Sequence, residues 1–286
     1  MPQPERVARL TLEPLELRGE AGGQVTITDA WTLTADDVRV MGLSALAVLP
    51  DRRLQALSDS GALVTFARPG SGASPAAVSD LPDGPGYPTF KKYRDSEAMI
   101  VDPDGRGRLV AFESRHSLWR FNSNAGAKRL PVVLPSARWS RNKGIEAMVE
   151  ERSGGALLLL HEGGRFALRV GDSSRPEQVP LAGATGGIAD AVRLPNGRIV
   201  VAVREIGLLG LTNKLAWLER LGRGYRLRNF ATLPLGPFDN VEGLAAEREP
   251  DGRTILWAVT DNDGWRRTLL LRMTLDTTKA PARAGA

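Results

Sequence analysis

Short apolar stretches separated by tight turns run along most of this chain. Residues 199–203 and 255–259 are apolar runs of the length typical of buried strands, and turn sequences precede them, Pro-Asn-Gly at 195–197 and Pro-Asp-Gly at 250–252. No window shows the sustained apolar spacing of three and four residues that marks an amphipathic helix. The pattern therefore predicts an all-β protein.

One arrangement of strands recurs five times. It consists of an apolar strand of small residues, a turn, a second apolar strand that ends near an acid, another turn and a third strand. The five copies occupy residues 42–66, 96–121, 144–170, 187–218 and 241–273. The equivalent positions Ser44, Glu97, Glu146, Ala189 and Glu242 are 53, 49, 43 and 53 residues apart. Periods of roughly 40–50 residues with about four strands each are typical of a β-propeller.

Each copy leaves room for a fourth, outer strand. Residues 128–134, 177–181 and 225–233 supply one after the second, third and fourth copies, whereas little chain follows the fifth. Residues 25–33 resemble these outer strands, and we expect them to complete the fifth copy and close the ring, because closure leaves no open sheet edge. Residues 67–86 are rich in Gly, Pro, Ser and Ala and predict a long surface loop.

The domain organisation follows from these repeats. Five blades are visible, and a sixth blade built from residues 1–41 and 67–94 is the alternative. A length of 286 residues alone would allow one domain or two. The repeats predict a single β-propeller over residues 1–286, with N-terminal strands in 1–41, five repeats in 42–275 and a tail in 276–286.

Acidic residues occupy two recurring positions in the repeat. Near the start of the first strand stand Glu97, Glu146 and Glu242, with Asp190 displaced by one position and Ser44 in the first copy. At the end of the second strand stand Asp59, Glu113, Glu162, Glu205 and Asp261. In an antiparallel hairpin the start of one strand lies beside the end of the next. Both sets are therefore expected at one end of the propeller, around the mouth of its central channel.

Composition narrows the chemistry that these acids could serve. The chain has no cysteine and two histidines, which excludes disulfides, thiolate metal sites, a cysteine nucleophile and a zinc site of three histidines. Carboxylates gathered at one channel mouth repel one another unless cations offset them. Calcium accepts six to eight oxygen ligands in flexible geometry, so it is the metal we expect there. The alternative is that the acids bond backbone amides or pair with nearby arginines. The cations next to the acidic positions, which could offset part of their charge, are Arg115, Arg141, Lys143, Arg204, Arg266 and Arg267.

The charge and hydropathy of the chain limit its partners. A net charge of +5 is spread along the sequence and only 6% of residues are aromatic, so we expect no nucleic-acid partner. No apolar run approaches the roughly 20 residues that span a bilayer. The first residues have neither the basic nor the apolar segment of a secretory signal, so none is expected in this chain. We expect a monomer.

The common catalytic motifs are absent. The sequence has no Gly-x-Ser-x-Gly elbow, no phosphate-binding Gly-x-x-x-x-Gly-Lys loop and no His-Glu-x-x-His. His116 follows an acid at an expected blade end, so it is either a channel acid or base or an ordinary loop residue. His161 directly precedes Glu162 and therefore points to the opposite face of its strand, which favours a packing role.

Several segments together resemble a known family. They are GLSALAVLPD at 42–51, LSDSG at 57–61, AFE at 111–113, NKGIEA at 142–147, IADA at 188–191, NVEGL at 240–244, TDND at 260–263 and RTLLL at 267–271. They are similar to the bacterial phytase-like proteins called "esterase-like activity of phytase", over about residues 10–275. The resemblance implies a β-propeller like that of calcium-dependent phytases, export to the periplasm or medium, and activity towards phosphate esters. Ser44 and Ala189 interrupt the ring of acids, and residues 207–211 are unusually apolar for a catalytic rim.

The leading hypothesis is a calcium-dependent phosphoester hydrolase, a phosphatase or phosphodiesterase, acting on a small anionic ester. Its metal ligands would come from Glu97, Glu113, Glu146, Glu162, Glu242 and Asp261. Its catalytic residues would be Glu146, Glu242, Asp261 and Glu113, and its substrate-binding residues Arg115, Arg141, Lys143 and Arg204. Two alternatives stay open. One is a lactonase-type calcium-dependent ester hydrolase using Glu146, Asn142, Asn240 and Asp261; the other is a non-catalytic propeller that binds a polyanion, an envelope component or a protein.

Overall fold

The computed structural model of the chain describes residues 5–70, 74–86, 94–122, 126–140, 143–152, 155–261 and 267–278. Over this part the protein is all-β, as its hydrophobic pattern predicts, and it includes two 3-10 turns, η1 (Val38–Val40) and η2 (Ser136–Arg138). No helix in these ranges is long and apolar enough to cross a membrane.

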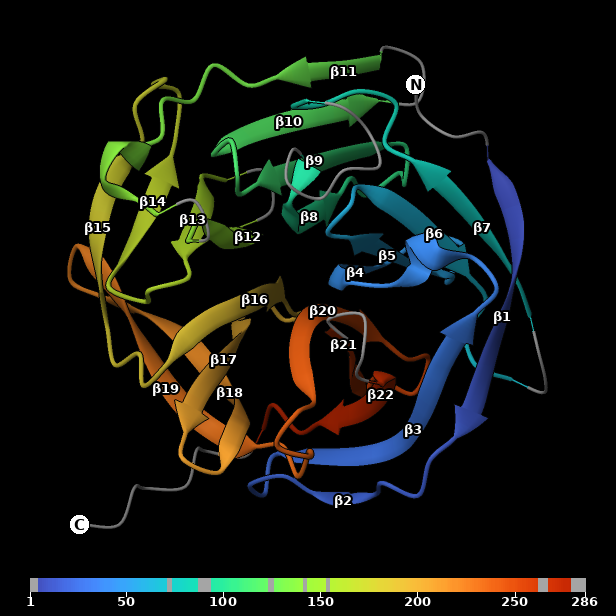
Figure 1. The fold of residues 1–286 in the computed structure, drawn as a ribbon. Coiled ribbons are helices and arrows are strands. Elements are labelled where there is room, and N and C mark those ends of the chain that lie inside the picture. The colour runs from blue at the N-terminus through green and yellow to red at the C-terminus, as the bar shows by residue number, and fades with distance from the viewer. Residues whose placement is uncertain are drawn as a thin grey trace.

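The described strands form three hydrogen-bonded sheets of ten, four and eight strands, and within these sheets antiparallel pairing joins twenty of the 22 strands into five groups of four (Figure 1). The first group is β4 (Leu43–Val48), β5 (Leu54–Ser58), β6 (Ala62–Phe66) and β7 (Ser74–Asp80). The second is β8 (Ser96–Val101), β9 (Gly107–Phe112), β10 (Ser117–Asn122) and β11 (Gly126–Arg129). The third is β12 (Ile145–Glu150), β13 (Leu157–His161), β14 (Phe166–Val170) and β15 (Glu177–Ala182). The fourth is β16 (Gly187–Arg193), β17 (Ile199–Gly207), β18 (Gly210–Leu221) and β19 (Gly224–Thr232). The fifth is β20 (Asn240–Arg248), β21 (Thr254–Asp261), β22 (Thr268–Leu275) and β3 (Val25–Ala35).

The first strand of each group faces a common centre. Strands β4, β8, β12, β16 and β20 contact one another in cyclic order, β20 against β4 included, and Figure 1 shows them around the middle of the molecule. Their closeness explains the small residues noted in the sequence. A Cβ atom on Gly243 would lie 2.8 Å from the backbone carbon of Ala45, so only glycine fits where β20 passes β4.

The N-terminal strands attach to groups made by later sequence. β3 pairs antiparallel with β22, with Leu33 opposite Thr268 and Val25 opposite Leu275, so residues 25–33 lie against the fifth group as the sequence predicts. β1 (Arg6–Pro14) pairs with both β3 and β7, and the short β2 (Gly19–Glu20) pairs with β3. The two ends of the described chain are thereby held in one sheet.

Two expectations about the outer strands were wrong. Residues 67–86 are not one long loop, because β7 lies within them and pairs with β6 and β1. Ala76 and Val78 point inward and are fully buried, so tertiary pairing overrides the weak strand propensity of this Ser, Pro and Ala sequence. The outer strand expected at 128–134 ends at Arg129, two residues before Pro131, which has no N–H to donate to a ladder.

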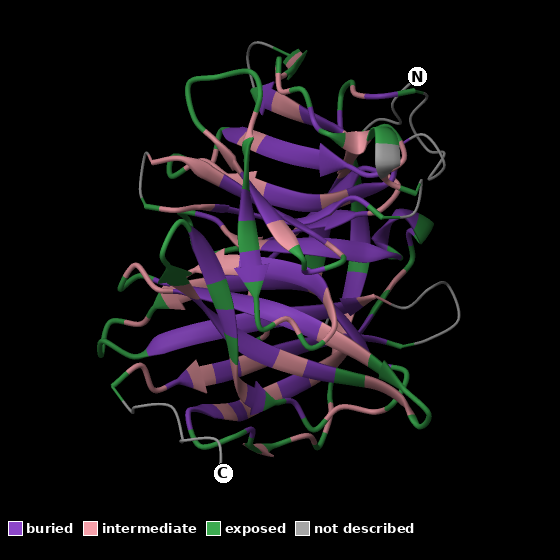
Figure 2. Cartoon of the chain, turned by 90° about the vertical axis from the view of Figure 1, so that its left-hand side faces the viewer, coloured by how far each residue is buried: buried purple, intermediate pink, exposed green. Residues whose placement is uncertain are grey.

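Apolar side chains fill the spaces between neighbouring groups. Between the fourth and fifth groups, for example, Val200 and Trp217 pack with Leu256 and Leu271. Figure 2 shows that burial follows the strands, while exposed residues gather at the connections. Because this packing fixes each group against the next, the strand ends that surround the centre are held in defined positions.

Candidate functional site

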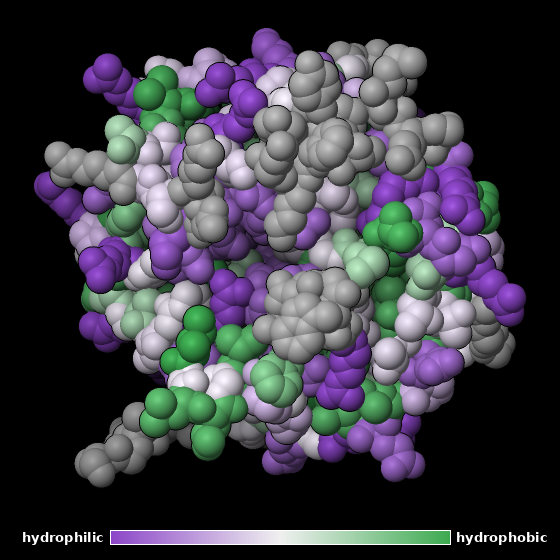
Figure 3. All heavy atoms as spheres, in the orientation of Figure 1, coloured by the Kyte–Doolittle hydropathy of each residue, from purple (hydrophilic) through white to green (hydrophobic). Residues whose placement is uncertain are grey.

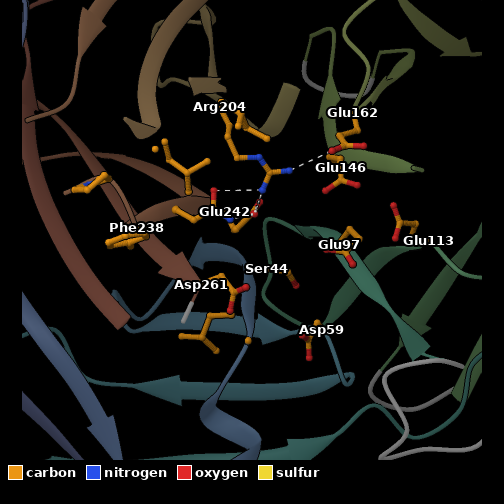
Figure 4. Close-up of a pocket in the computed structure, with 17 residues that line it drawn as sticks. Ser44, Asp59, Glu97, Glu113, Glu146, Glu162, Arg204, Phe238, Glu242 and Asp261 are labelled. Atoms are coloured by element: carbon orange, nitrogen blue, oxygen red, sulfur yellow. Dashed lines mark hydrogen bonds and ion pairs between the residues drawn. The ribbon is translucent and has the colours of Figure 1, made fainter. Parts of the chain in front are cut away.

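A cavity of about 490 Å³ opens at one end of the central strands. Figure 4 shows acidic side chains from several groups converging on it. Its lining consists of Gly42, Leu43, Ser44, Asp59, Glu97, Glu113, Glu146, Glu162, Arg204, Ile206, Gly210, Leu211, Pro237, Phe238, Asn240, Glu242 and Asp261. Seven of these residues are acids, and Arg204 is the one cation among the lining residues that the structure describes.

A β-bulge recurs in each central strand, and in four of the five the residue at the bulge lines this cavity, whereas Ala189 packs in the apolar core. The pairing register shifts around the same position in all five groups, at Ser44, Glu97, Glu146, Ala189 and Glu242. A bulge inserts one unpaired residue and turns its side chain away from the regular alternation. These are the five positions that the repeat spacing identifies as equivalent, and the three acids among them all line the cavity.

The second set of side chains comes from the ends of the second strands. Asp59, Glu113 and Glu162 directly follow those strands and Asp261 is the last residue of its strand, and all four line the cavity, as the sequence predicts. In the fourth group the expected acid, Glu205, was assigned wrongly. Val203 pairs with Ile188 as His161 pairs with Ile145, so the residue equivalent to Glu162 is Arg204. Successive side chains of a strand point to opposite faces, so Glu205, one residue further on, points away from the cavity. It forms an ion pair with Lys214 at 2.7 Å.

Asp190 also does not face the cavity. It is buried, and its two carboxylate oxygens accept hydrogen bonds from the backbone N–H groups of Ala191, at 2.7 Å, and Leu244, at 2.6 Å. Burial raises the pKa of Asp190 well above its ordinary value. The residue therefore ties β16 to β20 and contributes nothing to the ring of acids in which the sequence placed it.

Arg204 bridges acids from two other groups. Its guanidinium forms ion pairs with Glu242 and with Glu162 Oε1, the latter at 3.2 Å, and donates to Asn240 Oδ1 at 3.2 Å (Figure 4). The charge of Glu242 is the main cause that raises the pKa of Arg204 above its ordinary value. A permanent cation thus fills the position where the fourth group lacks an acid.

The remaining acids lie close enough to disturb one another. Burial raises the pKa of Glu146 well above its ordinary value, and the nearby Glu97 and Glu242 raise it further. Burial, followed by the charge of Asp95, raises the pKa of Glu113 to about 7, while a hydrogen bond with Glu146 acts in the opposite direction. At neutral pH Glu113 therefore exists in both protonation states in the metal-free site.

Three of the acids form a cluster with metal-ligand spacing. Carboxylate oxygens of Asp95, Glu97 and Glu113 all lie within 4.8 Å of one another. Two oxygens bound to one calcium ion at about 2.4 Å each can lie that far apart. Sequence reasoning missed Asp95, which precedes the bulged Glu97 by two residues. The sequence held one signal for it: Asn240 stands two residues before the equivalent Glu242, so a polar residue recurs at this position of the repeat.

Of the other expected cations, some contact an acid of the cavity and some do not. Lys143 forms an ion pair with Glu162 Oε2 at 3.4 Å. Arg115 is exposed and does not line the cavity. Arg267 pairs with Asp239, beside the cavity-lining Phe238, rather than with a cavity acid. Arg141, Asn142 and Arg266 lie outside the described residues.

Glycines make room for the acids. Gly42 has a φ of +64°, and a Cβ atom there would lie 2.5 Å from a carboxylate oxygen of Asp59. A Cβ atom on Gly144 would lie 2.7 Å from Cγ of Glu113. Both are closer than real Cβ contacts, so these positions need glycine for the present arrangement of carboxylates.

The histidines belong to an aromatic cluster beside the cavity. His161 packs against Trp139 with ring centroids 4.7 Å apart and stacks on Phe166, which agrees with its expected packing role. His116 contacts the edge of the same tryptophan at 5.2 Å and is not among the cavity-lining residues. Burial lowers the pKa of both histidines. Neither is positioned as the acid or base of the cavity.

Comparison with known proteins gives one match in sequence and several in structure. The model of a phytase-like family, described as esterase-like activity of phytase, matches residues 38–264. No curated protein matches the chain. A catalytically inactive virginiamycin B lyase from Staphylococcus aureus with quinupristin is similar at 10% identity and a TM-score of 0.48, over 94% of this chain and 99% of that one. A protein of unknown function from Bacteroides thetaiotaomicron is similar at 8% identity and a TM-score of 0.48, over 94% of this chain and 76% of that one.

Proposed function

The chain belongs to the phytase-like family described as esterase-like activity of phytase, and from that premise we propose that it is a calcium-dependent phosphoester hydrolase whose active site is the acidic cavity. The observation that carries the proposal is the lining itself, in which seven carboxylates face one cationic side chain. Such an excess of like charge is costly to hold together without an added cation.

We interpret the scaffold as a single propeller domain of five blades that β3 closes. The support is the cyclic contact of the five central strands and the antiparallel pairing of β3 with β22. β1 and β7, which come from segments that could have formed a sixth blade, pair with strands of these five groups instead. In this arrangement the cavity lies at one mouth of the central channel.

The donor set fits calcium. The ligands would come from Glu97, Glu113, Glu146, Glu162, Glu242 and Asp261, with Asp95 added by the cluster described above. All these donors are carboxylate oxygens, which calcium prefers and accepts in number. When bound, calcium would offset the carboxylate charge, polarise phosphate oxygens and acidify a bound water.

The protein's own residues supply proton transfer and anion binding. Burial and neighbouring acids raise the pKa of Glu113 to about 7 without calcium, and Glu113 could accept a proton from the attacking water or donate one to the leaving oxygen only in a state in which it does not ligate calcium. Burial and four nearby acids raise the pKa of Glu146, so calcium binding there would favour loss of its proton. Glu242 and Asp261 are the further acids that we propose to act on the substrate from the fifth group.

Substrate phosphate would bind on the side of the fourth group. Arg204 lines the cavity there and offers guanidinium donors suited to phosphate oxygens. The side chain of Lys143 forms an ion pair with Glu162 and is half exposed, so it can turn towards a bound anion. We propose Arg115, which does not line the cavity, only for a substrate that extends beyond it. The substrate-binding role of Arg141, which lies outside the described residues, stays a prediction.

The lactonase-type alternative uses the same cavity. It requires the amide oxygen of Asn240 as a calcium ligand. That oxygen accepts a hydrogen bond from Arg204, and the amide nitrogen of Asn240 donates to Glu242. Because Arg204 pairs in the same way with Glu162 and Glu242, which the phosphoesterase proposal uses, this contact does not separate the two proposals, and the choice between phosphoester and lactone substrates does.

The test is hydrolysis of p-nitrophenyl phosphate and bis(p-nitrophenyl) phosphate with added calcium and with EGTA. We expect turnover with calcium, loss of turnover in EGTA, and loss of turnover in Glu146→Gln and Glu242→Gln although both variants stay folded by circular dichroism. Glu177→Gln, which removes an exposed acid, serves as the control. Full activity in EGTA, or hydrolysis of a lactone without hydrolysis of either phosphoester, would contradict the proposal.

A further inference from the structure

The hairpin between β17 and β18 presents large apolar side chains to solvent. Leu208 and Leu209 form its two-residue turn and are 107% and 94% exposed, and the adjoining Ile206 is 81% exposed. Figure 3 shows hydrophobic side chains gathered over this hairpin, at the lower left of the view. Two neighbouring leucines at a turn are unusual, because turns favour Gly, Asn, Asp and Ser.

The same hairpin forms one wall of the acidic cavity. Ile206 and Leu211 line the cavity, and so does Phe238, which is 58% exposed. Figure 4 places Phe238 on the side of the cavity away from Glu113 and Glu162. The cavity therefore has an acidic wall and an apolar wall, and the apolar wall continues outward to the leucines of the turn.

The hairpin is held in a fixed position rather than left as a loose loop. The ladder between β17 and β18 continues to the pair Gly207 and Gly210, so only two residues lie beyond it. Leu211 N–H donates to the carbonyl oxygen of Pro237 at 2.9 Å. A Cβ atom on Gly210, where φ is +110°, would lie 2.5 Å from Pro237 Cβ. The hairpin and the segment that carries Phe238 thus form one rigid apolar projection.

We propose that this projection, made of Ile206, Leu208, Leu209 and Phe238, inserts into the surface of an anionic lipid membrane or aggregate. Four side chains are too few for a stable protein interface, which uses roughly 20–30 residues and about 800 Å² per partner. They are sufficient for shallow insertion at a lipid surface, where exposed leucine and phenylalanine side chains leave water. The net charge of +5, spread along the whole chain, favours approach to anionic rather than neutral lipid at long range, although the cavity beside the projection is itself acidic.

Insertion has a consequence for the substrate, which rests on the function proposed above. A phosphoester whose head group enters the acidic cavity would leave any acyl chain along Ile206 and Phe238, towards the turn leucines. The substrate class that matches both walls is an amphiphilic phosphoester presented at a lipid surface. A small fully polar ester would use the acidic wall alone.

The experiment is co-sedimentation with vesicles of phosphatidylcholine mixed with phosphatidylglycerol, and with phosphatidylcholine alone, in EGTA so that calcium bridging plays no part. The test variant is Leu208→Ser/Leu209→Ser, and the control is Val7→Ser, an exposed apolar residue on β1. We expect the wild type and Val7→Ser to bind the anionic vesicles. The affinity of the double variant for them should be lower by roughly tenfold or by a larger factor. A tryptophan introduced as Leu209→Trp should show a blue-shifted emission on binding.

Three results would overturn the proposal. They are no binding of the wild type, equal binding of the double variant, and a dimer in size-exclusion chromatography that the double variant converts to monomer. The catalytic part is measured separately with p-nitrophenyl phosphate, which needs no lipid, and with phosphatidic acid in vesicles. If the wild type hydrolyses neither substrate, the proposed function is refuted. Vesicle binding then still decides the membrane proposal by itself. The double variant should lose only the activity on phosphatidic acid.

Discussion

Arg204, on the second strand of the fourth group, forms an ion pair with Glu242, at the bulge of the first strand of the fifth. On its other side Arg204 pairs with Glu162 of the third group. The fourth group contributes no acid to the cavity, since Ala189 and Arg204 stand at its two ring positions. The charge of the cavity is therefore uneven, and an anionic group meets least repulsion on the side of Arg204.

Replacing Arg204 by alanine should destabilise the protein. The substitution leaves Glu162 and Glu242 without their shared cation, so we expect a loss of about 2–4 kcal/mol in the free energy of unfolding in EGTA. Added calcium should restore part of the loss, because it offsets the same carboxylates. Urea unfolding measures both effects. Arg253→Ala, which breaks an exposed pair with Asp251, should cost less than about 1 kcal/mol; equal costs for the two variants would refute the bridging role.

The stability of the calcium-free protein should fall as pH rises through the range set by Glu113. In the unfolded chain this group loses its proton near 4.5, whereas in the folded chain its pKa is about 7. Between these values the folded state binds more protons, so the free energy of unfolding decreases as pH increases. Below this range both states are protonated and the effect vanishes.

Urea unfolding in EGTA across this pH range tests the effect of Glu113. Glu113→Gln is neutral at every pH and should show a shallower decline than the wild type. Glu177→Gln, at an exposed position, should keep the wild-type slope. A slope in Glu113→Gln as steep as that of the wild type would show that other acids dominate.

Asp190 should matter for stability and not for calcium. Asp190→Ala leaves the N–H groups of Ala191 and Leu244 without their acceptor in a buried place, which should cost about 2–4 kcal/mol. Because its carboxylate does not line the cavity, the calcium affinity of the folded variant should equal that of the wild type. Calorimetric titration below the unfolding transition checks this, and a weakened affinity would place Asp190 among the ligands after all.

Gly144→Ala should weaken calcium binding without unfolding the chain. The new Cβ atom would lie 2.7 Å from Cγ of Glu113 and must displace that side chain from its present place. Gly171→Ala is the matched control, since a Cβ atom there meets nothing within 4 Å. Calorimetric titration of both variants measures the difference. Equal affinities would mean that Glu113 is not a ligand or that it relaxes without consequence.

Much of this architecture could be predicted from the sequence because it repeats. The equivalence of Ser44, Glu97, Glu146, Ala189 and Glu242 follows from spacing, and the structure gives each of them the same bulge. Single departures from the repeat were harder to predict from the sequence. Arg204 and Glu205 are neighbours, and only the pairing register decides which of them faces the cavity.

Other features depend on contacts that sequence spacing does not contain. Asp95 joins the metal-like cluster because the first strand of its group begins beside Glu113, and strand pattern alone placed it outside the repeat. β7 forms because β6 and β1 pair with its backbone, although its own residues favour a loop. The bridge from Arg204 to Glu162 and Glu242 spans three groups, so it depends on how far each group is rotated about the centre.

The central claim is that the acidic cavity binds calcium, and calorimetric titration of chelator-treated protein with calcium tests it most directly. We predict saturable binding accompanied by a higher melting temperature, both lost in Glu146→Gln and both kept in Glu177→Gln. Because Glu113 is partly protonated near neutral pH, binding should also release protons, seen as a heat that depends on the ionisation enthalpy of the buffer. No binding at millimolar calcium, with an unchanged melting temperature, would contradict the account.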